Sequence, residues 1–117
     1  MNDMASPSLL SPTADPLNGD PDLRKELAAL YLADYPQLLA RIRQAIGDRS
    51  GPELKAAAHS LKGSSGVFRD QCAFDAALRL EIIGSNADWA RAEEACQRVC
   101  EETGRLAGDL AALIAAP

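Results

Sequence analysis

The strongest constraint on the fold is an apolar seam in the C-terminal part of the chain. Apolar or small side chains recur there in alternating steps of three and four residues, at Trp89, Ala92, Cys96, Val99, Thr103, Leu106, Leu110 and Leu113. This spacing is typical of a helix packed in a bundle. Gly104 and Gly108 each cost such a helix about 1 kcal/mol relative to Ala, but both lie off the seam. We therefore expect one long helix that begins near residue 87 or 88.

The composition fits a helical domain. The chain has 117 residues, of which 47% are apolar and only 4% aromatic, enough for one modest core without the aromatic and β-branched content of a sheet. A net charge of −5 argues against a nucleic-acid partner. No apolar run approaches the roughly 20 residues of a membrane span. The first basic residue is Arg24, so the N-terminus lacks the charged start that is typical of a signal peptide. Together with the odd cysteine count, this indicates a cytoplasmic location with reduced thiols.

The helices before the seam are marked by their capping residues and by one proline. Residues 1–19, rich in Pro, Ser and Asn, are expected to form a flexible N-terminal tail or linker, and residues 20–117 the folded domain. Asp20 and Pro21 are typical of a helix start. Because Pro36 interrupts the pattern, we expect a short first helix ending near Ala33 and a second from residues 34–36 to Gly47.

Two further caps divide the middle of the chain. Ser50 and Glu53 are expected to form a capping box for a third helix that runs to about residue 68 or 69. Asp70 is expected to cap a fourth helix ending at Ile83. The predicted fold is all-α, an antiparallel four-helix bundle with a short additional N-terminal helix.

The third helix carries the only histidine of the chain on its polar side. At about 100° per residue, one sector collects the apolar stripe: Leu54, Ala57, Ala58, Leu61, Ser65 and Phe68. The opposite sector collects His59 with Lys55, Lys62, Gly63 and Gly66. We therefore expect His59 to face water as an available nucleophile. The glycines beside it indicate either an open surface for a partner or a helix that ends at Gly63.

This segment resembles a known family. Ala58-His59-Ser60-Leu61-Lys62-Gly63-Ser64-Ser65 is similar to the central motif of the histidine-containing phosphotransfer (HPt) domains of two-component phosphorelays. Weaker similarities at Tyr35-Pro36, Asp48 and Leu80-Glu81 extend the likeness over residues 22–114. The chain departs from the family where Arg69-Asp70 replaces a Gly-Ala pair, which puts the packing at the end of the third helix in question.

The resemblance implies a role for each residue of the motif. His59 would accept a phosphoryl group on the ring nitrogen farther from the main chain. Lys62, helped by Lys55, would neutralise the phosphate, and Gly63 with Gly66 would admit the partner. The partners would be a response-regulator receiver domain and a sensor or hybrid histidine kinase. The domain would be a monomer without autonomous catalytic activity, cofactor or metal site. The receiver would supply Mg²⁺. Separately, the alanine- and arginine-rich composition suggests a bacterial source.

Two other functions are left open by the residues. The domain could be a non-phosphorylated helical docking module in which His59 is only part of a contact surface. A small acid–base enzyme is less favoured, because no carboxylate or nucleophile lies at a supporting offset from His59 in the sequence. Cys96 and Cys100, four residues apart, could be a ligand pair, but packing in the seam is the favoured role.

Overall fold

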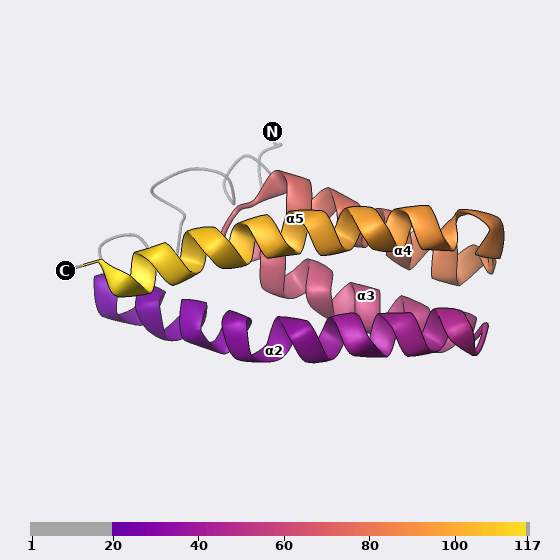
Figure 1. Ribbon diagram of the computed structural model, residues 1–117, viewed down its shortest axis with the longest axis horizontal. Helices are drawn as coiled ribbons and strands as arrows, with labels where there is room; N and C mark the ends of the chain where they lie inside the picture. Colours follow the sequence, from indigo (N-terminus) through magenta and orange to yellow (C-terminus); the bar gives the residue numbers. More distant parts are fainter. Residues whose placement is uncertain (1–19, 117) are drawn as a thin grey trace, which may run out of the picture.

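The computed structural model describes residues 20–116 and contains four antiparallel helices (Figure 1). They are α2 (Pro21–Gly47), α3 (Gly51–Gly66), α4 (Gln71–Asn86) and α5 (Trp89–Ala115). The packed pairs are α2 with α3, α3 with α4, α4 with α5, and α5 with α2, which closes the bundle around one core. The described residues form no strand, so the predicted all-α bundle is confirmed. The expected tail, residues 1–19, lies outside the described residues.

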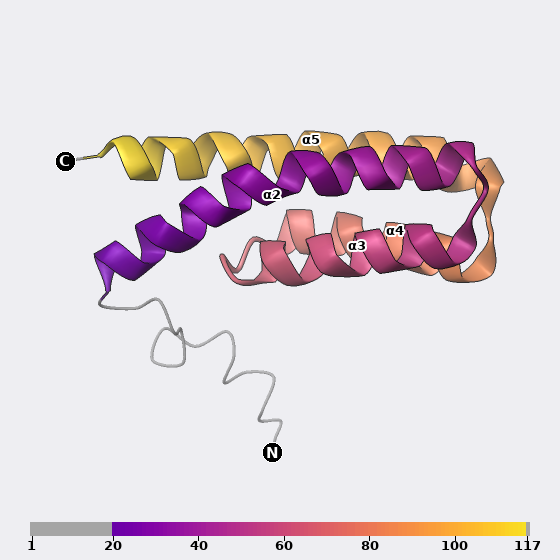
Figure 2. The same ribbon diagram turned by 90° about the horizontal axis from the view of Figure 1, so that it is seen from below.

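The predicted break at Pro36 is wrong, because α2 is one continuous helix through this residue. Proline removes one backbone hydrogen bond and bends a helix without necessarily ending it. Figure 2 shows the bend, with the N-terminal part of α2 turned away from the direction of the rest. Buried residues on both sides, Tyr31 before the proline and Ile42 after it, hold both parts of the helix on the core. The expected additional N-terminal helix is therefore the first half of α2.

The predicted N-cap side chains are confirmed, but the second half of the capping box is not, because the Ser50 N–H donates to the Ala45 carbonyl at 2.9 Å and Glu53 pairs with Arg41. The side chains of Asp20, Ser50 and Asp70 accept backbone N–H groups three residues on, at 2.9, 3.4 and 2.9 Å. The helix end considered at Gly63 does not occur, since α3 continues to Gly66. The far ends differ from the prediction by a few residues, α3 stopping before Val67 and α4 continuing to Asn86.

One end of the α3–α4 pair is held by a very close approach of the two backbones. A Cβ atom added to Gly84 would lie 2.8 Å from the Lys55 nitrogen, and one added to Gly51 would lie 2.7 Å from the Gly84 oxygen. Only glycine fits such a contact. It fixes the position of α3 against α4, and with it the alignment of the α3 residues that follow Lys55.

The predicted seam of α5 faces the core. Ala92, Val99 and Thr103 are fully buried, and the Thr103 hydroxyl donates to the Val99 carbonyl at 2.7 Å. Leu106 and Leu110 continue the buried stripe toward the C-terminus. Among residues 20–116, no helix is both long and apolar enough to cross a membrane.

Candidate functional site

His59 lies on the exposed face of α3, as the helical periodicity predicts. The residues of the apolar stripe within the helix are buried, whereas 66% of the His59 side chain is exposed. The imidazole is therefore accessible while its helix is anchored from below by Ala58 and Leu61. A ring on a rigid helix can be presented to a partner in one orientation.

A carboxylate from the neighbouring helix contacts this ring. Glu81 of α4 places Oε2 3.1 Å from Nδ1 of His59. The Glu81 side chain is only 15% exposed, so it lies beneath the ring rather than over it. No carboxylate lies at a supporting sequence offset from His59, and Glu81 is supplied instead by the next helix.

The contact determines which ring nitrogen carries the proton. An ionised carboxylate only accepts hydrogen bonds, so Nδ1 carries a proton and donates a hydrogen bond to Glu81. In the neutral form of the ring, the lone pair is then on Nε2, the nitrogen farther from the main chain. Lys62 has the largest effect on the pKa of Glu81 and lowers it. Burial raises this pKa, the contact with His59 lowers it, and the net result is a lowered pKa. Glu81 is accordingly charged near neutral pH.

Lys62 is more covered than its place on the helical wheel predicts. Its ammonium lies 2.9 Å from Glu81 Oε1 and 5.9 Å from the centroid of the Phe74 ring, and its side chain is 19% exposed. The contact with Oε1 is an ion pair that is not aligned as a hydrogen bond. Glu81 therefore bridges the imidazole and the ammonium, and it holds the lysine charge beside the His59 ring.

The two glycines that flank this face differ in their surroundings. A Cβ atom added to Gly63 would meet nothing within 4 Å, so the surface beside His59 is open there. One added to Gly66 would lie 3.3 Å from Cδ2 of Phe74, so this glycine also serves the packing of α3 on α4. Lys55, one turn before His59, is exposed.

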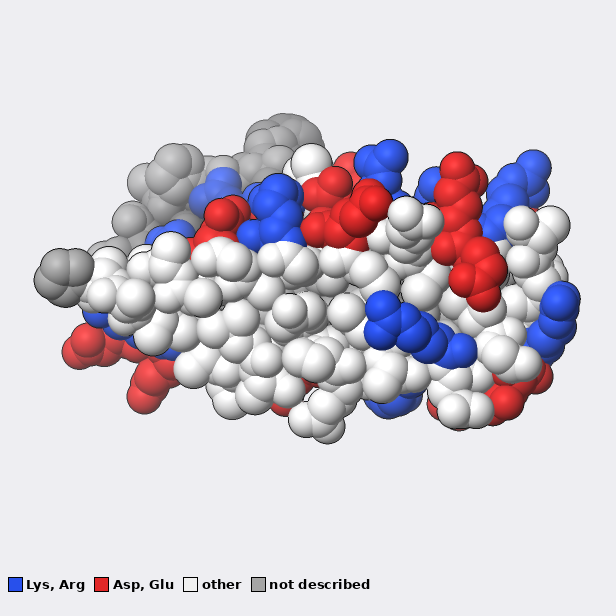
Figure 3. Space-filling model, in the orientation of Figure 1, with Lys and Arg blue, Asp and Glu red and all other residues white. Residues whose placement is uncertain are grey.

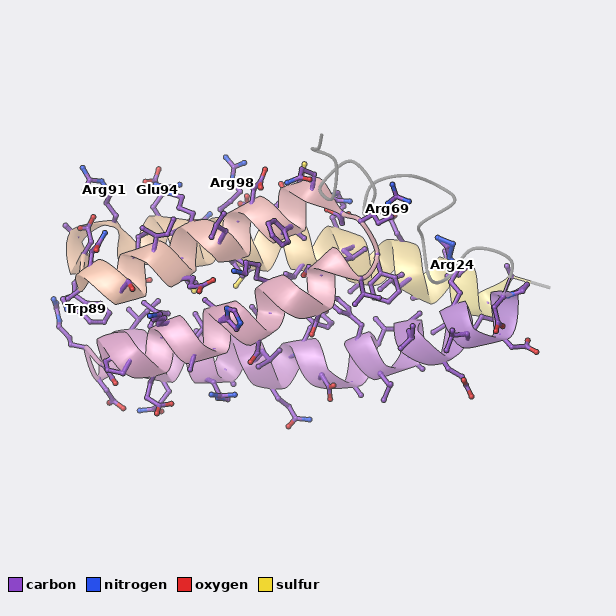
Figure 4. All side chains as sticks on the ribbon, turned by 180° about the vertical axis from the view of Figure 1, so that it is seen from behind. Arg24, Arg69, Trp89, Arg91, Glu94 and Arg98 are labelled. Atoms are coloured by element: carbon purple, nitrogen blue, oxygen red, sulfur yellow. The ribbon has the colours of Figure 1, made fainter. Side chains whose placement is uncertain are left out.

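The Arg69-Asp70 pair, which departs from the family pattern, is accommodated at the turn after α3. Arg69 has a φ of 59°, the left-handed conformation that favours glycine. Asp70 caps α4 and receives two hydrogen bonds from Arg105 of α5, at 2.7 and 2.9 Å. Figure 4 shows Arg69 at this end of the molecule, away from Arg91 at the start of α5. The turn is thus held by a cap and an ion pair.

The part of the chain described by the structure offers no group of three or more His, Cys, Asp or Glu side chains that could hold a metal ion. A family model for the Hpt domain matches residues 26–116, a span that includes the whole site from Lys55 to Glu81. No curated protein and no solved structure matches the chain significantly.

Proposed function

This chain is a member of the Hpt domain family, and from that premise we propose that it relays a phosphoryl group through His59. Hpt domains have a phosphotransfer role in two-component signalling and interact with receiver domains and kinases. The observation that supports the proposal is the exposed His59 ring, whose Nδ1 contacts Glu81. Nε2 would then be the nucleophile.

In the proposed reaction, the donor is the aspartyl phosphate of a receiver domain. The Nε2 lone pair attacks phosphorus, the N–P bond forms as the O–P bond breaks, and the electron pair of that bond returns to the aspartate carboxylate. Positive charge develops on the imidazole as the bond forms. Glu81 lies where this charge appears, and its preorganised carboxylate stabilises it. The reverse sequence returns the group to a receiver.

The surroundings of His59 suit a docking partner. Ala56 and Ser60 are small and exposed, and Gly63 has open space above it. Farther along α3, beyond His59, the exposed apolar side chains of Leu30 (57%) and Val67 (39%) lie beside a hollow of about 200 Å³ that does not include His59. Such a mixture of small and apolar groups fits a transient interface in the class below about 1,200 Å². Lys55 and Lys62 would offset the charge of the phosphate.

The remaining partner assignments follow from the same proposal. The phosphoryl group would enter the relay from a sensor or hybrid histidine kinase and leave to a response regulator. Mg²⁺ would belong to the receiver, and this chain would add no catalytic metal of its own. We propose that the domain works as a monomer in the cytoplasm.

The test is transfer from a phosphorylated receiver domain. The wild-type chain is expected to acquire an acid-labile, base-stable phosphate, and His59→Gln is expected to acquire none while remaining helical. Glu93→Gln, at an exposed position of α5, is the control that should transfer normally. Binding of the receiver by both proteins without any label would favour the docking module and overturn the proposal.

A further inference from the structure

A pair of thiols outside the phosphotransfer site lies between α5 and α2. Cys96 and Cys100 are one turn apart on α5, Cys96 buried and Cys100 partly exposed. Arg43 of α2 donates a hydrogen bond from Nη2 to Cys100 Sγ at 3.2 Å. Figure 3 shows the face formed by α2 and α5, on which charged side chains are sparse away from the edges. The hydrogen bond from Arg43 to Cys100 connects α2 to α5.

The two thiols differ in their surroundings. The hydrogen bond from Arg43 orients the Cys100 sulfur, and a thiolate is the form in which a cysteine reacts. Burial, followed by the neighbouring Cys100, raises the pKa of Cys96 to about 11, so this thiol stays protonated near neutral pH. The pair therefore joins an accessible thiol next to a positive charge with a protected thiol one turn away.

We propose that Cys100 and Cys96 form a peroxide-responsive thiol pair in which Cys100 attacks first and Cys96 resolves. The Cys100 thiolate attacks the O–O bond of a hydroperoxide, so that an S–O bond forms and the alcohol or water leaves after taking a proton. Cys96 then attacks the resulting sulfenic acid, the S–S bond forms, and hydroxide leaves with the Cys96 proton as water. Two thiols and one hydroperoxide thus give one disulfide, one alcohol or water, and one water.

The helical spacing makes this disulfide strained and reversible. Side chains four residues apart on a helix have Cβ atoms about 5–6 Å apart. A disulfide needs a Cβ separation of about 3.5–4.5 Å. The bond can therefore form only if α5 tightens locally, and strained disulfides are easily reduced. Oxidation should lower the thermal stability of the bundle, because Cys96 and Val99, the residue before Cys100, pack in the core.

The experiment uses the full chain with Cys72→Ser, which removes the exposed third thiol. The protein is treated with hydrogen peroxide and digested with trypsin without reductant. Because Arg98 separates the two cysteines, the disulfide appears as residues 92–98 linked to residues 99–105. The expected result is this linked pair, its absence in Cys96→Ser, and its reversal by dithiothreitol. Sulfinic or sulfonic acid on Cys100 without the linked pair would overturn the proposal.

The contribution of Arg43 is tested by the rate of reaction. Arg43→Gln should slow alkylation of Cys100 by iodoacetamide, and formation of the linked peptides, by roughly threefold or more, since the neighbouring positive charge is lost. Arg41→Gln is the matched control, because Arg41 lies on the same helix and faces Glu53 instead. Equal rates in the two variants would refute the role of Arg43. Neither result depends on phosphotransfer, so the two proposals fail separately.

Discussion

The contact between Glu81 and His59 makes a quantitative prediction for Glu81→Gln. The amide oxygen of Gln can still accept the Nδ1 proton, so the tautomer is retained, whereas the negative charge that stabilises the developing imidazolium is lost. A hydrogen bond to a charged group contributes about 1.5–3 kcal/mol when shielded from water. Because 66% of the His59 side chain is exposed, the lower end of this range or less applies. A loss of about 1 kcal/mol corresponds to a rate about fivefold lower.

The assay is the single-turnover rate of transfer from a phosphorylated receiver to the variant at saturating receiver. Glu81→Gln should slow this step about fivefold without changing the binding affinity of the receiver. Glu94→Gln, an exposed glutamate of α5 that pairs with Arg79, serves as the control for loss of one negative charge. A wild-type rate in Glu81→Gln would show that the carboxylate does not act on the transition state. A complete loss, as in His59→Gln, would show that it does more than supply charge.

Three further outcomes follow from the structure. Gly63→Gln should leave the helical content unchanged but slow transfer at least about tenfold, because the new side chain fills the open surface where the partner docks; an unchanged rate would contradict the docking geometry. Gly84→Ala should lower the free energy of unfolding by about 2–3 kcal/mol in urea denaturation, since its Cβ would overlap the Lys55 nitrogen, and a neutral effect would contradict that contact. Burial opposes ionisation of Asp70, but the hydrogen bonds from Arg105 outweigh it and lower the pKa of Asp70. Its stabilising contribution is present above the unfolded-state pKa and lost as the pH falls through the lower folded-state pKa, so Asp70→Asn should weaken the acid dependence of stability, and an identical acid limb would refute this.

The features that depend on local periodicity could be predicted from the sequence. The exposure of His59 follows from the spacing of Leu54, Leu61 and Ser65, because a helix with one buried side must present its other side to water. The helix starts at Asp20 and Asp70 follow from cap chemistry, which involves only neighbouring residues. Each of these features is encoded within one or two helical turns.

The features that depend on packing between helices could not be predicted in this way. Pro36 was expected to end a helix, but tertiary burial of Tyr31 and Ile42 keeps α2 continuous and bent. The contact of Glu81 with His59 depends on how α4 lies against α3, which no offset in the sequence encodes. The similarity of Leu80-Glu81 to the family was the one signal that pointed toward this helix.

The position of Glu81 beneath His59 has a consequence for how the sequence of such a domain can diverge. Glu81 contacts both the His59 ring and Lys62 from the α4 side. The close contact between Gly51 and Gly84 fixes the position of α4, and therefore of Glu81, relative to α3. The outward side chains of Ala56, Ser60 and Val67 are exposed. We therefore expect substitutions at these outward positions to alter the choice of the proposed partner without disturbing the contact between Glu81 and His59.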